Sequence, residues 1–245
     1  MAKIPREGVT HAALVPNLKG ATNAISANAS QLVVVISATD AHNQANVRRT
    51  IDESLTDLDS IFTLAQNKDI PVNGAISVAF GCPYQGDISE ADVFRVAEAY
   101  ISRGAAAVIL ADTTGMATPI RVDNLVRQFR DQFPGTDFVL HFHNNRGTAM
   151  ANLLAALMAG ATTFDTALGG IGGCPYVPQA AGNLPTEDVV FMLEDMGIST
   201  GIDLEKIIMA SHLLENFLGY SLPGQVMKSG PRDPKLAARI CGINQ

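Results

Sequence analysis

The feature that most constrains this chain is the order in which two kinds of segment alternate along it. Short apolar runs are separated by longer segments in which apolar residues recur every three or four positions. The runs are typical of parallel strands covered on both faces, and the longer segments are typical of amphipathic helices. We predict a strand in each of six runs: 11–16, 31–38, 72–80, 106–112, 137–143 and 162–168.

Several of the longer segments carry helix signals at their ends. Ser89 and Asp92 have the spacing of a capping box, and Thr118 and Pro119 are suited to the N-cap and first position of a helix. The buried face of the first of these helices is predicted to hold Val93, Val96, Ala97 and Ile101. We predict helices over 89–104, 118–133, 186–197 and 203–219.

Repeated β-then-α units fit two architectures, an open doubly wound sheet or most of an eight-stranded barrel. No G-x-G-x-x-G motif follows the first predicted strand, which argues against a dinucleotide-binding open sheet. No stretch rich in Pro, Ser, Gly or charge interrupts the alternation. Residues 1–245 are therefore predicted to form a single domain.

The composition excludes several classes of partner. The 17 Lys and Arg residues are scattered and the net charge is -7, so we expect no nucleic-acid partner. The apolar runs are too short to span a bilayer and the N-terminus lacks a signal-peptide core, so we expect a soluble, cytoplasmic protein without membrane contact. Cys82, Cys174 and Cys241 are expected to be free thiols.

Two histidines end the fifth predicted strand. Residues i and i+2 of a strand point the same way, so His141 and His143 share one face while Phe142 points to the other. They lie at the carboxyl end of the strand, where parallel α/β folds place their sites. The pair fits two interpretations, a shared divalent metal ion or a packed, hydrogen-bonded pair.

Other candidate residues follow strands or lie in glycine-rich loops. Cys174 lies in "GGIGGCPY" and Cys82 in the similar "GCPYQG", and local sequence does not distinguish a catalytic thiol from a turn cysteine. Asp112 fits either an acceptor that holds a ligating histidine or a cap for turn amides. Asn17 is open to the same two interpretations, and Asn183 also fits a simple loop amide.

Five stretches taken together carry a family resemblance. They are "LVPNLKG", "GCPYQGDIS", "ADTTGMATP", "HFHNNRGTAMANLLAALMAGATTFDTALGGIGGCPY" and "GNLPTEDVVFMLEDMGIST", in this order along the chain. The chain resembles the 3-hydroxy-3-methylglutaryl-CoA (HMG-CoA) lyase family, a branch of the metal-dependent lyase and synthase barrels. The resemblance implies a TIM (β/α)8-type barrel in place of the open sheet.

The resemblance also implies a role for each motif. His141, His143 and Asn183 match the family's metal-binding residues, Cys174 matches its catalytic loop cysteine, and His141 also takes part in proton transfer. Asp112 and Asn17 are expected near the ligands or in the substrate pocket. The implied cofactor is a divalent metal, Mg²⁺ or Mn²⁺, and the implied partners are an acyl-CoA substrate and a second copy in a homodimer.

The chain departs from the family pattern at its start. Family members begin with a strand that carries Arg-Asp-Gly, whose aspartate binds the metal, and a second strand adds an acidic residue. This sequence starts at "MAKIPREGV", within the second helix of the family pattern. We therefore expect an incomplete barrel with six of the eight βα units.

The resemblance implies a reaction for the complete site. HMG-CoA would be cleaved to acetyl-CoA and acetoacetate in a metal-assisted retro-Claisen step, as in leucine degradation. One alternative is a lyase for another 3-hydroxyacyl-CoA, such as citramalyl-CoA. A second alternative is a truncated, inactive barrel that serves as an interaction or structural subunit, with its strand edges covered by a partner.

Overall fold

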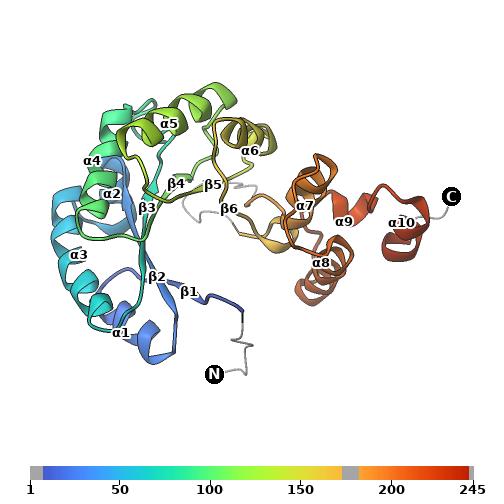
Figure 1. Cartoon of the computed structure of the whole chain (residues 1–245), viewed down its shortest axis with the longest axis horizontal. Helices are drawn as coiled ribbons and strands as arrows, with labels where there is room; N and C mark the ends of the chain where they lie inside the picture. Colours follow the sequence, from blue (N-terminus) through green and yellow to red (C-terminus); the bar gives the residue numbers. More distant parts are fainter. Residues whose placement is uncertain (1–7, 173–181, 243–245) are drawn as a thin grey trace.

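The computed structural model describes residues 8–172 and 182–242, and six parallel strands form its sheet. The strands are β1 (Ala12–Leu14), β2 (Gln31–Ser37), β3 (Val72–Ser77), β4 (Ala107–Asp112), β5 (Phe138–Phe142) and β6 (Phe164–Asp165). Each strand pairs with the next one in sequence, so the spatial order is the chain order (Figure 1). The sheet curves into part of a barrel, which confirms the predicted incomplete TIM-type barrel.

Helices cover the outer side of this curved sheet (Figure 1). The helices up to β6 are α1 (Leu18–Ser26), α2 (Asp40–Val47), α3 (Ile51–Gln66), α4 (Glu90–Ile101), α5 (Pro119–Gln132) and α6 (Ala149–Met158). Beyond β6 come η1 (Leu168–Gly170), α7 (Thr186–Asp195), α8 (Leu204–Leu218), α9 (Val226–Ser229) and α10 (Pro234–Cys241). Within the described residues, none of these helices has the length and apolarity that a bilayer crossing requires.

The predicted helix signals are found at the predicted places. The capping box of Ser89 and Asp92 begins α4, and Thr118 is the N-cap of α5 with Pro119 in the first turn, although the Thr118 hydroxyl makes no capping bond. On α4 the fourth fully buried position is Tyr100, while Ile101 is only partly buried. Ile101 still packs against the main core, as predicted, and Tyr100 adds a fully buried position to the same face of the helix.

All six strands are shorter in the structure than their predicted runs, and the difference is largest for β1, β3 and β6. β1 and β6 lie at the edges of the described sheet, so each pairs on one side and keeps two or three residues. β3 ends at Ser77 because Val78 has a φ of 54°, a rare conformation for a β-branched residue. The amide of Val78 donates instead to Oγ1 of Thr113, on the loop after β4, at 3.0 Å.

The main core lies between the sheet and the helices on its outer side. Its largest fully buried side chains include Tyr100, Phe129, Ile76, Leu110 and Leu140. The Tyr100 ring packs on Gly74 so closely that a Cβ at Gly74 would lie 2.3 Å from Cγ of the ring. The Tyr100 hydroxyl donates to the carbonyl of Ala75 at 3.0 Å, so its polar end is satisfied within the core.

Candidate active site

The site is built on the carboxyl end of β5, where His141 and His143 point to the inner face of the sheet. Their Nε2 atoms are 3.1 Å apart, and the ring planes are tilted by 56°. The alternation of side chains along the strand brings both rings to one face, as predicted. Both rings also line the inner cavity of the sheet, so the two nitrogens meet at the edge of a space that a substrate can reach.

Burial determines the charge of His143. Its side chain is 6% exposed, and this burial, with a smaller contribution from the charge of His141, lowers its pKa from 6.5 to about 4. His143 is therefore neutral at pH 7, which is the protonation state that a metal-binding imidazole requires.

Asp165 orients the other histidine. β5 and β6 place His141 directly opposite Asp165, and Oδ2 of Asp165 lies 3.4 Å from Nδ1 of His141. A carboxylate beside Nδ1 favours the tautomer with the proton on that nitrogen, which leaves the lone pair of Nε2 directed toward His143. Asp165 was not among the predicted site residues.

Asn183 joins the two histidines from a distant part of the sequence. Its backbone forms an isolated bridge with that of His143. Its side-chain Nδ2 donates to the carbonyl of Ile171 at 2.9 Å, which fixes the orientation of the amide. Oδ1 of Asn183 is buried and accepts no hydrogen bond of normal geometry within the described residues, although the amide lies close enough to the His143 ring to act against the lowering of its pKa. A buried oxygen without a partner is costly, so this atom is suited to a ligand that the protein itself does not supply.

The glycines of the loop before Asn183 allow this close approach. Gly172 has a φ of 104°, and a Cβ there would lie 2.5 Å from Nδ2 of Asn183. Gly182 has a φ of 67°, and a Cβ there would lie 2.2 Å from the carbonyl oxygen of Gly170. Larger residues at either position would push the loop away from Asn183.

These three residues fit a divalent metal as part of its ligand set. Two nitrogens bound at right angles to one ion, each at about 2.1 Å, lie about 3 Å apart, which matches the His141–His143 separation. The unpartnered Oδ1 of Asn183 supplies an oxygen. In the described part of the chain, no three His, Cys, Asp or Glu side chains form a metal-binding group by themselves. Substrate oxygens, water or other carboxylates would complete the coordination.

Asp112 caps a turn at the carboxyl end of β4. Its Oδ1 accepts from the amides of Met116 at 2.7 Å and Ala117 at 3.1 Å, and no hydrogen bond to either histidine is found. The structure shows the cap on Oδ1, while Oδ2 is buried without a hydrogen-bond partner among the described residues, so a role of Asp112 beside the ligands stays a prediction. Burial raises its pKa from 3.8 to about 6, although these amides and the charges of Arg146 and His141 act in the opposite direction. Arg146 reinforces the same turn by donating to the carbonyls of Thr114 and Gly115.

Asn17 lies apart from this group. Oδ1 of Asn17 accepts from the amide of Gly20 and caps α1, and Asn17 lines a different cavity, on the outer side of β2. Cys174 lies outside the described residues. Cys82 is fully buried, with its sulfur 3.2 Å from Oγ1 of Thr39, so the first of the two similar cysteine loops does not present a thiol to a substrate.

The inner cavity extends from the histidines across the concave side of the sheet. Its volume is about 440 Å³. Apolar side chains line most of it, including Val33, Val35, Ala75, Ile109 and Val139. The polar group His141, His143 and Asp165 is at one end, so the cavity combines an apolar wall with a few convergent polar atoms, as ligand sites do.

Comparison with known proteins identifies the family. A sequence model of the HMGL-like family matches residues 2–214 of this chain. The chain belongs to the HMGL-like family. The matched range includes His141, His143, Asp165 and Asn183.

Individual relatives of this HMGL-like chain are lyases. It is 42% identical over 230 residues to a hydroxymethylglutaryl-CoA lyase of Bacillus subtilis, covering 92% of this chain and 77% of that protein. It is 44% identical over 227 residues to an (R)-citramalyl-CoA lyase of Chloroflexus aurantiacus, covering 92% of this chain and 71% of that protein.

A solved structure supports the same assignment. The structure of an HMG-CoA lyase from Acinetobacter baumannii, in complex with coenzyme A and 3-methylmalate, aligns with a TM-score of 0.90 at 43% identity. The alignment covers 94% of this HMGL-like chain and 75% of that one.

Sequence reasoning missed Asp165 in this site, although a signal for it was present. Asp165 is the acidic residue of the run 162–168, which was otherwise predicted as a strand. An acidic residue in an otherwise uncharged strand run at the site edge was that signal, although the Asp165 side chain is 47% exposed and burial alone does not require a partner for it. The strand register, which the sequence does not specify, was needed to pair Asp165 with His141.

Proposed function

We propose that this chain is a carbon–carbon lyase that cleaves HMG-CoA to acetyl-CoA and acetoacetate. The observation that carries the proposal is the convergence of Nε2 of His141, Nε2 of His143 and the unpartnered Oδ1 of Asn183 at the carboxyl end of the sheet. The similarity to the Bacillus subtilis enzyme, over most of both chains, supports this choice of substrate.

We infer that His141, His143 and Asn183 hold a divalent metal, Mg²⁺ or Mn²⁺. HMGL-like enzymes generally depend on a divalent metal. When bound, such an ion supplies positive charge that lowers the pKa of a substrate hydroxyl and polarises a carbonyl oxygen. The oxygen-rich sites that Mg²⁺ and Mn²⁺ prefer would be completed by the hydroxyl and carbonyl oxygens of the substrate.

The protein's own residues would hold and move the protons. The carboxylate of Asp165, 3.4 Å from Nδ1, would hold the His141 ring with the lone pair of Nε2 available. Nε2 would serve as a metal ligand in the resting site and would accept the proton of the substrate hydroxyl only once substrate oxygens have replaced it as ligands. The charge that His141 gains is then stabilised by the same carboxylate. His143 stays neutral because of its burial, so it does not compete for that proton.

The second proton step concerns the acetyl-CoA enolate that remains when the C–C bond breaks. We propose Cys174 as the donor to its carbon atom, on the family resemblance alone, since this residue lies outside the described part of the chain. Loss of the proton leaves a thiolate, which His141 in its protonated state would neutralise.

A second substrate is favoured by one observation. The (R)-citramalyl-CoA lyase of Chloroflexus aurantiacus is 44% identical to this chain, as similar as the HMG-CoA lyase. Both substrates are 3-hydroxyacyl-CoA esters that leave the same enolate, so the same histidines would serve both. The acyl group that the apolar wall of the inner cavity accepts would decide between them.

The test is to incubate the purified chain with HMG-CoA or with citramalyl-CoA, in Mg²⁺, Mn²⁺ or chelator, and to follow acetyl-CoA by mass spectrometry. We expect product that disappears with chelator and in the His143→Gln and Asn183→Ala variants. His212→Gln, a change on α8, is the matched control and should keep the activity. Absence of product from folded protein, or product that survives chelator, would refute the proposal.

Further properties follow as proposals from the family and the composition. We infer an acyl-CoA partner, because a related structure holds coenzyme A, and a function in leucine degradation. We also propose a single domain over residues 1–245, a homodimer and a cytoplasmic location. Sedimentation velocity of the purified chain tests the homodimer, which should have twice the monomer mass.

A further inference from the structure

A second cavity lies on the outer side of the sheet, between β1, β2 and α3. Its volume is about 360 Å³, within the range of small-molecule pockets. Five buried aliphatic side chains form its wall: Val15, Val34, Ile36, Leu58 and Ile61. An apolar group bound against this wall would itself be shielded from water.

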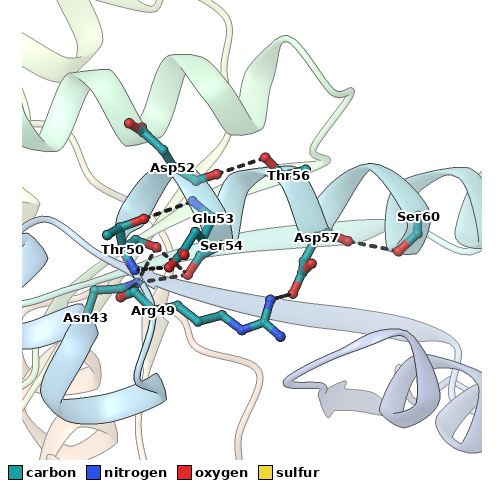
Figure 2. Close-up of polar contacts among 9 residues, drawn as sticks. All are labelled: Asn43, Arg49, Thr50, Asp52, Glu53, Ser54, Thr56, Asp57 and Ser60. Atoms are coloured by element: carbon teal, nitrogen blue, oxygen red, sulfur yellow. Dashed lines mark hydrogen bonds and ion pairs between the residues drawn. The ribbon is translucent and has the colours of Figure 1, made fainter.

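An ion pair lies beside this aliphatic wall. Figure 2 shows Arg49, just before α3, extended along the helix toward Asp57, and the two side chains form an ion pair. Both residues line the cavity. The side chains are 50% and 49% exposed, so the pair contributes at most about 1 kcal/mol to stability. A ligand can therefore separate the two charges at little cost.

The backbone beneath the ion pair is fixed. Nδ2 of Asn43 donates to the carbonyls of Arg49 and Thr50 (Figure 2). Oδ1 of Asn43 accepts from the amide of Ser37 at the end of β2. Thr50 begins α3 with a complete capping box. The side chains of the ion pair can thus move while their attachment points stay in place, which lowers the entropic cost of binding.

We propose that this cavity binds an α-amino acid with a branched aliphatic side chain. The ligand carboxylate pairs with the guanidinium of Arg49, the ammonium pairs with Asp57, and the side chain fills the space against the aliphatic wall. A zwitterion replaces the Arg49–Asp57 pair with two new pairs, whereas a simple anion or cation leaves one of the two residues unpaired.

This site is independent of the proposed lyase site. The outer cavity lies against Val34 and Ile36 of β2, Val33 faces the inner cavity that contains the histidines, and Val35 is the one residue that lines both cavities. Binding at the outer cavity can therefore be measured without any turnover. If no amino acid binds there, the lyase proposal is not affected.

The test is isothermal titration calorimetry of the purified chain with L-leucine as the probe. Two analogues separate its charges, 4-methylpentanoate without the ammonium group and 3-methylbutylamine without the carboxylate. We expect L-leucine to bind at least about tenfold more tightly than either, because each analogue leaves one charge unpaired. Equal affinity for leucine and an analogue would overturn the proposal, as would no binding of leucine at millimolar concentration.

Substitutions of cavity residues test whether leucine binds in the outer cavity. Arg49→Gln and Asp57→Asn should each weaken leucine binding about tenfold, and Ile61→Phe, which fills the cavity, should abolish it. The matched control is Arg127→Gln, which breaks an exposed Arg–Asp pair on α5 and should leave binding unchanged. Thermal unfolding confirms that each variant is folded. Leucine binding that persists in the Arg49, Asp57 and Ile61 variants would refute this location.

Discussion

The buried carboxyl of Asp112 leads to a quantitative prediction about stability and pH. Its pKa is raised from 3.8 to about 6 by burial, so the folded protein binds this proton more tightly than the unfolded chain does. The stability that this proton contributes is therefore complete below pH 3.8 and is lost as the pH rises to about 6. At about 1.4 kcal/mol for each tenfold change in proton affinity, the loss is about 3 kcal/mol.

The substitution Asp112→Asn removes this titration while leaving an oxygen to accept from Met116 and Ala117. Relative to the wild type, the free energy of unfolding of the variant should rise by up to about 3 kcal/mol between pH 4 and pH 7. The value at the lowest pH, where the carboxyl is neutral in the folded protein, reports mainly the exchange of hydroxyl for amide. The change with pH therefore isolates the buried charge.

The assay is urea unfolding at several pH values, followed by far-UV circular dichroism because the chain has no tryptophan. The control is Asp123→Asn, since Arg127 lowers the pKa of the exposed Asp123 carboxyl and the stability it contributes is lost as the pH falls. The control difference should therefore change in the opposite direction. A difference for Asp112→Asn that is constant or falls with rising pH would refute the reasoning.

Three further predictions concern single side chains. Asp165→Ala should weaken divalent-metal binding about tenfold, because His141 loses the partner that fixes its tautomer. The measurement is calorimetry with Mn²⁺, and an unchanged affinity would show that Asp165 does not orient His141. Gly74→Ala should destabilise the protein by about 2 kcal/mol or more in urea unfolding, because the new Cβ overlaps the buried Tyr100 ring. Ser89→Ala should cost about 1 kcal/mol in the same measurement, and an unchanged midpoint would contradict the importance of the capping box.

Much of the fold could be predicted because local signals and burial agree. The six apolar runs each contain a strand, since parallel strands buried on both faces need a continuous apolar sequence. The ends were less predictable. Val78 is apolar and continues the run of β3, but its positive φ ends the strand, and that φ depends on a hydrogen bond to Thr113 from another βα unit.

In the candidate site, too, some features follow from local sequence and others depend on tertiary contacts. The common direction of His141 and His143 follows from the two-residue repeat of a strand, so sequence alone predicts it. The approach of Asn183 and the contact of Asp165 depend on which strands and loops are neighbours. Asn17 was placed by analogy near the pocket, yet its carboxamide caps α1, a local role that the sequence "PNLKG" also permitted.

The shortness of β6 has a consequence for the order of events when the protein opens. β6 has two residues and its ladder with β5 joins only Leu140 to Phe164 and His141 to Asp165. Short edge elements open at a lower free energy than the whole molecule unfolds, so amides near Asp165 should exchange with deuterium sooner than those of β3 or β4. The His141–Asp165 pair would separate in that opening while the rest of the sheet stays folded. The time for which the His141–Asp165 pair stays assembled is then set by the local opening of β6, and not by global unfolding of the domain.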